Sequence, residues 1–103
     1  MSKSHLERFI KVYEDVQCKK PLEKVSFGLS RKMDVYLLNT FPHRFEVEEL
    51  EFFDEDVTCE SMNNEDLLPN VPTKITLVFS PKEDRKTMLN TTFLIHGRYI
   101  IEP

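Results

Sequence analysis

The sequence is poor in the residues that build helical bundles and nucleotide-binding loops. It contains no alanine and no tryptophan, and only two glycines. Alanine is the best helix former, so its absence argues against a helical bundle. Two glycines are too few for a phosphate-cradling loop or a dinucleotide-binding fingerprint. The sequence therefore offers no nucleotide-dependent enzyme motif.

Cysteines and long apolar runs are scarce as well. Cys18 and Cys59 are far apart and match neither a zinc site nor a redox pair, so we expect two unpaired thiols. No apolar run has the length needed to span a bilayer, and residues 1–8 lack the apolar region of a signal peptide. We expect a cytoplasmic or nuclear protein with no direct membrane insertion.

Catalytic motifs are missing too. The three histidines, His5, His43 and His96, stand alone in the sequence, without the spacing of a metal-binding motif. The many carboxylates could supply an acid–base pair, but they form a dense run without the signature of a pocket. We therefore expect no enzyme activity, no metal and no cofactor.

Positive charge is absent from one long segment. Between Glu46 and Asp66 there are ten acidic residues and no lysine or arginine, within a chain of formal net charge −4. Such a segment repels phosphate backbones, so nucleic-acid binding is disfavoured, and it attracts a basic protein partner. The alternative is a solvated strand face that runs into an acidic loop.

The sequence is rich in short segments with period-two alternation, which place one buried and one solvated face on each strand. Strands are expected over residues 24–30, 33–39, 44–54, 57–60, 73–80 and 89–97. Residues 98–101 either extend the last strand after a kink at Gly97 or begin another. This pattern predicts a mainly β fold, a small antiparallel β-sandwich of immunoglobulin-like type over residues 21–103.

The longest expected strand, residues 44–54, changes phase in its middle. Apolar residues alternate as far as Val47, Glu48 and Glu49 follow in succession, and the alternation resumes at Leu50. Two successive polar residues predict a β-bulge that restores the register.

The first twenty residues carry a helical pattern. Ser4 and Glu7 have the spacing of a capping box, and Pro21 ends any continuation. An apolar stripe follows at helical spacing: Leu6, Phe9, Ile10, Tyr13 and Val16. We expect a helix within residues 1–20 that packs on the sandwich or on a partner.

Two segments carry a family resemblance. They are "MDVYLLNTFPHRFEVEELEFF" and "LLPNVPTKITLVFSPKEDRKTMLNTTFLIHGRY". Their order of strands and proline-containing turns resembles the immunoglobulin-like domains in the large subunits of transport-protein-particle (TRAPP) vesicle tethers. The resemblance covers about three-quarters of the chain and implies an accessory module in a membrane-trafficking assembly.

A second resemblance competes with the first. The run "ITLVFSPKEDRKTMLNTTFLI" is similar to the C-terminal sandwich of β-mannosidase-like glycoside hydrolases. That resemblance implies a non-catalytic accessory domain of an enzyme. A self-associating structural domain is a third alternative, because unpaired strand edges and the helix stripe would both permit a homodimer.

These observations favour a non-catalytic protein–protein interaction module of a larger intracellular assembly. The preferred contact strand is residues 44–54, where an outward Phe53 lies among acids. The predicted partner-binding residues are Glu46, Glu48, Glu49, Glu51, Phe53, Asp54, Glu55 and Asp56.

Overall fold

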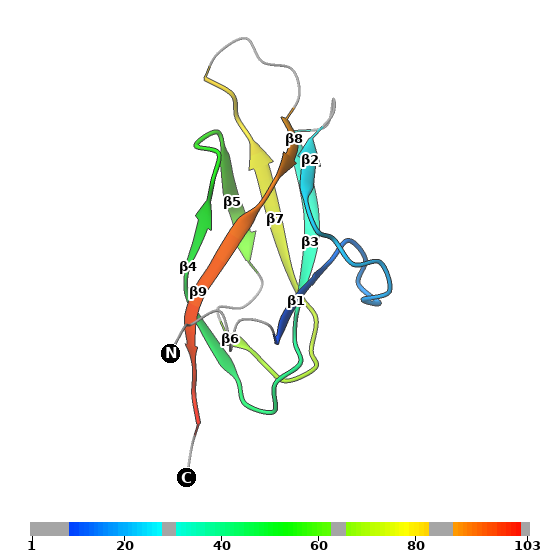
Figure 1. Ribbon diagram of the computed structural model, residues 1–103, viewed down its shortest axis with the longest axis vertical. Coiled ribbons are helices and arrows are strands. Elements are labelled where there is room, and N and C mark those ends of the chain that lie inside the picture. Colours follow the sequence, from blue (N-terminus) through cyan, green and yellow to red (C-terminus); the bar gives the residue numbers. More distant parts are fainter. Residues whose placement is uncertain (1–8, 28–30, 63–65, 83–87, 102–103) are drawn as a thin grey trace.

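A computed structural model of the chain describes residues 9–27, 31–62, 66–82 and 88–101. All regular structure in these ranges is β: the described residues form nine strands and no helix. The strands lie in two layers, with β2, β8, β9 and β4 in front of β1, β3, β7 and β5 in Figure 1. Every pairing between named strands is antiparallel.

The rear layer is a four-stranded sheet with the order β1-β3-β7-β5. Its strands are β1 (Ile10–Tyr13), β3 (Lys32–Asn39), β7 (Thr73–Phe79) and β5 (Val57–Met62). The central pair, β3 and β7, keeps an unbroken register along its whole length. This pair forms the centre of the sheet, and β1 and β5 are its edges.

The front layer consists of two short sheets, and the consecutive strands β8 and β9 connect them. In one, β2 (Val25–Phe27) pairs with β8 (Met88–Thr91). In the other, the order is β6 (Asp66–Leu67), β4 (Phe45–Phe52) and β9 (Phe93–Tyr99). A single residue separates β8 from β9, so the segment predicted as one strand over 89–97 forms two strands with different partners.

The core lies between the layers and follows from the alternation of each strand. In β7, every second side chain from Thr73 to Phe79 is buried. The other strands supply the remaining apolar members. The buried apolar residues are Val25, Phe27, Val35, Leu37, Phe45, Val57, Leu67, Ile75, Leu77, Phe79 and Ile95. Because these side chains come from both layers, one core holds the two layers together.

The predicted N-terminal helix is wrong where the structure describes it. Residues 10–13 form β1, which pairs with β3 in register from Ile10↔Asn39 to Tyr13↔Tyr36. A chain reversal follows, in which the Asp15 carboxylate accepts hydrogen bonds from the amides of the lysines at 19 and 20 (3.0 and 2.8 Å). The predicted capping residues lie outside the described residues. The edge of β3 offers backbone hydrogen-bond partners to residues 10–13, which favours a strand there. An isolated short helix would lack such tertiary support.

The predicted kink at Gly97 is not seen, because β9 runs through this residue to Tyr99. The close packing of β4 against β9 explains the glycine at this position instead. A Cβ at this position would collide with the Glu46 carbonyl oxygen and with the Phe45 ring. The close approach of β4 to β9 therefore requires a residue without a side chain.

Candidate functional site

The predicted partner-binding residues lie on β4 and on the turn that joins it to β5. The β4–β9 register passes from Val47↔Gly97 to Glu49↔His96, so Glu48 is an extra residue on β4. The predicted bulge is thus confirmed. Both Glu48 and Glu49 are exposed, on the side of the sheet away from the core.

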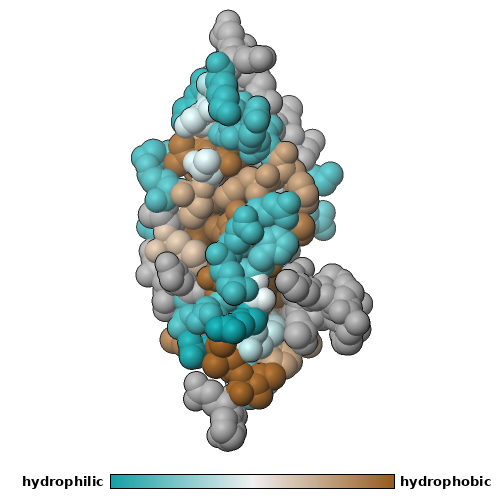
Figure 2. Space-filling view, turned by 90° about the vertical axis from the view of Figure 1, so that its left-hand side faces the viewer, coloured by the Kyte–Doolittle hydropathy of each residue, from teal (hydrophilic) through white to brown (hydrophobic). Residues whose placement is uncertain are grey.

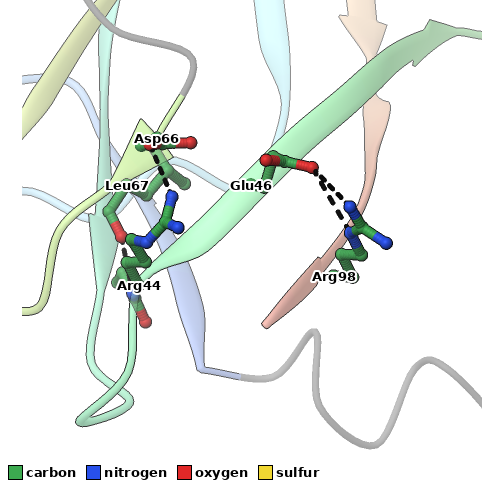
Figure 3. Close-up of polar contacts among 6 residues, drawn as sticks. Arg44, Glu46, Asp66, Leu67 and Arg98 are labelled. Carbon is green, nitrogen blue, oxygen red and sulfur yellow. Dashed lines mark hydrogen bonds and ion pairs between the residues drawn. The ribbon is translucent and has the colours of Figure 1, made fainter. Parts of the chain in front are cut away.

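Side chains that are remote in the sequence pair with part of this face. The Arg98 guanidinium on β9 lies 3.2 Å from the Glu46 carboxylate on β4, and Figure 3 shows this pair across the two strands. Two residues before Arg98 on β9, His96 Nε2 lies 2.7 Å from Glu51 Oε1. Two of the predicted recognition acids therefore already have a partner within the domain.

The rest of the acidic segment is also partly paired. Arg44 Nη1 lies 2.8 Å from Asp66 Oδ2, and Figure 3 shows the side chain reaching from the start of β4 to β6. Lys32 pairs with Glu60 at 2.9 Å. The cation-free stretch of sequence thus receives counter-charges from β3, from β9 and from the residue before β4.

Two glutamates are different. For Glu48 and Glu49 the described part of the chain supplies no ion pair, and both side chains are solvent-exposed. They are adjacent at the bulge, where the extra residue bends the strand. The negative charge of β4 that has no ion-pair partner among the described residues is therefore concentrated at the bulge.

The turn between β4 and β5 gives two acids a structural role. Asp54 Oδ1 accepts a hydrogen bond from the Asp56 amide at 2.9 Å, and the Asp54 carbonyl accepts one from the Val57 amide at 3.1 Å. The Asp56 carbonyl accepts from the Ser80 amide at 2.8 Å. Asp54 and Asp56 shape the turn, whereas the carboxylate of Glu55 lies 4.0 Å from the Lys82 amine and is exposed.

Phe53 lies in this turn and is 59% exposed, as predicted. It follows β4 directly, so the acidic strand face ends beside an exposed aromatic ring. Figure 2 views the molecule from the side of β4 and β5 and shows an apolar zone bounded by hydrophilic side chains. An aromatic anchor next to charge is typical of interaction surfaces.

Sequence reasoning missed a second feature at one end of the fold. A cavity of about 320 Å³ is lined by Pro42, His43, Arg44, Pro69 and Ile100. These residues come from the β3–β4 turn, from the loop after β6 and from the end of β9. The proline-containing turns were the available signal, but only the fold brings them together.

The side chain of Asn39 connects the segments at this end of the molecule through hydrogen bonds. Its fully buried amide donates to the carbonyls of His43 and Leu67, both at 2.8 Å. Its side-chain oxygen accepts from the Phe41 amide at 3.0 Å and from the Tyr99 hydroxyl at 3.4 Å. One side chain thus ties together the turn, β6 and β9.

The pKa values of Tyr99 and Cys18 are both raised. Burial raises the pKa of Tyr99 to about 12. Burial, and then the nearby Asp15 carboxylate, raise the pKa of the Cys18 thiol. Neither Cys18 nor Cys59 is part of a disulfide.

Comparison with models of known protein families, with curated proteins and with solved structures finds no match for this chain. In the described ranges, no group of three or more histidine, cysteine or acidic side chains could hold a metal ion. The same ranges contain no helix of the length and apolar character needed to cross a bilayer.

Proposed function

We propose that this domain is a non-catalytic protein-interaction module that binds a basic segment of a partner protein through β4. The observation that carries the proposal is the pair Glu48 and Glu49. They are exposed side by side at the bulge without an ion pair to a described residue, while Glu46 and Glu51 have cross-strand partners. Adjacent unpaired carboxylates offer a lysine or arginine a charge-assisted hydrogen bond.

Phe53 adds an apolar contact to this charged surface. At 59% exposure, most of its ring area is available to a partner. Burying that area contributes affinity, while the glutamates attract the partner during diffusion and speed association. The two parts therefore predict different kinetic signatures: charge acts on the association rate, and the ring acts mainly on dissociation.

We propose that the domain belongs to a larger intracellular assembly. The sequence resemblance to the TRAPP tethers suggests that this assembly acts in membrane trafficking. The alternatives are an accessory domain of a glycoside hydrolase and a self-associating domain. Self-pairing of β4 with its own copy would bring like charges together, which disfavours a homodimer through this strand. The outer side of β1 is already occupied, because the Val12 carbonyl accepts a hydrogen bond from the Leu22 amide at 2.9 Å.

The test compares two pairs of charge-removing substitutions. A partner is first recovered from cell lysate with the purified domain and identified by mass spectrometry, and its binding rates are then measured at low and high salt. The double variant Glu48→Gln/Glu49→Gln should slow association several-fold at low salt and leave the melting temperature unchanged. The matched control is Glu14→Gln/Glu23→Gln, which removes the same charge from exposed residues elsewhere.

Equal association rates for the two double variants would reject the β4 face as the recognition surface. Phe53→Ala provides a second, independent readout. It should raise the dissociation rate while the domain stays folded, because the ring is largely solvated in the free protein. Loss of folding in this variant would assign the ring a structural role instead.

A further inference from the structure

In the described part of the chain, strand β4 has an unpaired edge along most of its length. On one side it pairs with β9, and on the other side the described residues of β6 pair with Phe45 and Glu46. From Val47 to Phe52, no described strand occupies that second side. An unpaired strand edge presents a row of amide and carbonyl groups to any chain that can align with it.

The pairing fixes which backbone groups face outward. The Ile100 amide donates to the Arg44 carbonyl at 2.9 Å, which makes this a hydrogen-bonded pair of the β4–β9 ladder. Hydrogen-bonded and non-hydrogen-bonded pairs alternate, and the bulge shifts the alternation by one residue on β4. The backbones of Val47, Leu50 and Phe52 therefore point away from β9, toward the free edge.

The neighbouring edge belongs to β5, and it is built in a similar way. Its pairing with β7 shifts between Cys59 and Ser61, which leaves Glu60 as a bulged residue. Between the two edges, apolar side chains from both layers are only partly buried against the core. They are Val47, Leu50, Phe52, Cys59 and Met62. Figure 2 faces this side of the molecule and shows its apolar zone.

The carboxylates beside this edge favour a basic partner segment over a second copy of the chain. A second copy of the chain would bring its own Glu48 and Glu49 against the same residues, and like charges on neighbouring strands are destabilising. A basic segment would meet those carboxylates with opposite charge. An added strand would place alternate side chains beside Glu49 and Glu51 on the outer face, and the others beside Leu50 and Phe52 on the apolar face.

We propose that an extended partner segment, in which basic and apolar residues alternate, adds to β4 as a strand along Val47–Phe52. This inference rests on the proposed function, because it assumes that the β4 face recognises a basic segment. It adds the mode of binding, which is main-chain pairing, and the sequence pattern that the partner must have.

The experiment measures the binding of three synthetic peptides to the full chain. The first alternates lysine and valine, the second has the same composition in two blocks, and the third repeats the first with alternate backbone nitrogens methylated. Methylation removes the donors that a strand needs but keeps charge and apolar content. Binding is measured by fluorescence anisotropy, and amide hydrogen exchange is followed at Val47, Leu50 and Phe52.

The alternating peptide should bind at least about tenfold more tightly than the methylated and blocked peptides, since several main-chain hydrogen bonds depend on its pattern. It should also slow amide exchange at the three β4 residues. Equal binding of all three peptides, without slowed exchange, would overturn strand addition and leave charge-based docking intact. No binding of any peptide at low salt would overturn the inference and the proposed function together.

Discussion

The central pair β3–β7 and the outer pair β4–β9 are both antiparallel and are built from strands of similar length, but they differ in register and in burial. The register of β3–β7 is unbroken, and its inward residues Val35, Leu37, Ile75 and Leu77 are completely buried. The register of β4–β9 shifts at a bulge, and the inward residues of β4 beyond Phe45 are only partly buried. A pair inside a sheet can be optimised for packing alone, whereas an edge pair must also face solvent and partners.

The largest expected effect contrasts two leucines, one from each pair. Leu77→Ala should lower the free energy of unfolding by about 4 kcal/mol, because it leaves a cavity in a fully buried site. Leu50→Ala on β4 should cost only about 1–2 kcal/mol, because its site is already partly open to water. Urea denaturation of both variants measures the difference, and equal losses would show that both pairs are equally important for stability.

The second prediction concerns the contact between β4 and β9. Gly97→Ala should destabilise the domain by about 2–3 kcal/mol, because the added methyl would meet the Glu46 carbonyl and the Phe45 ring. Thermal denaturation would reveal the loss. Leu94→Ala, at an exposed position of the same strand, is the control and should change stability by less than about 0.5 kcal/mol. A harmless Gly97→Ala would mean that the two strands can separate without cost.

The third prediction is a pH dependence at the end of β9. Since burial raises the pKa of Tyr99 to about 12 in the folded protein, its neutral form stabilises the fold. A tyrosine in the unfolded chain ionises near pH 10. This contribution is therefore complete below pH 10 and is lost as the pH rises from about 10 to 12.

An absorbance titration of tyrosinate should contain a component with a midpoint near 12 that is missing in Tyr99→Phe. The hydroxyl also donates to Asn39 at 3.4 Å, so the variant loses one long hydrogen bond but keeps the tilted ring contact with Phe41. Its stability should consequently change less between pH 10 and 12 than that of the unaltered chain. An unchanged titration curve in the variant would contradict the assignment.

The smallest expected effect is that of the exposed ion pair on the outer face. A double-mutant cycle of Glu46→Gln and Arg98→Gln should give a coupling of about 0.5 kcal/mol, since both groups are solvated and the pair is screened by salt. The cycle is measured by denaturation at low salt and repeated at high salt. A coupling above about 2 kcal/mol would show that the outer face contributes to stability as strongly as a buried hydrogen bond.

The strands and the bulge could be predicted because their signals are local. Alternation in 73–79 and the doubled glutamates at 48 and 49 follow from the two-residue period of a strand, which needs no tertiary information. The prediction of an exposed Phe53 succeeded for the same reason. These are properties of one segment considered alone.

The errors all arose where a distant segment decides the outcome. The segment Ile10–Tyr13 fits both a helix stripe and a short strand, and pairing with the edge of β3 selects the strand. The acidic segment has no cation in sequence order, but the fold places Arg98 beside Glu46 and His96 within hydrogen-bond distance of Glu51. The role of Asn39 depends on carbonyls 4 and 28 residues away, which no local pattern could indicate.

The two bulges, at Glu48 on β4 and at Glu60 on β5, have a consequence for the behaviour of the protein in a crowded solution. An open sheet edge is a template for fibril growth, since identical strands can stack on it without end. An irregular edge that carries a glutamate at its bend cannot stack on copies of itself in a flat, continuous ladder. The two bulged glutamates thereby disfavour pairing of this side of the domain with a second copy of the chain.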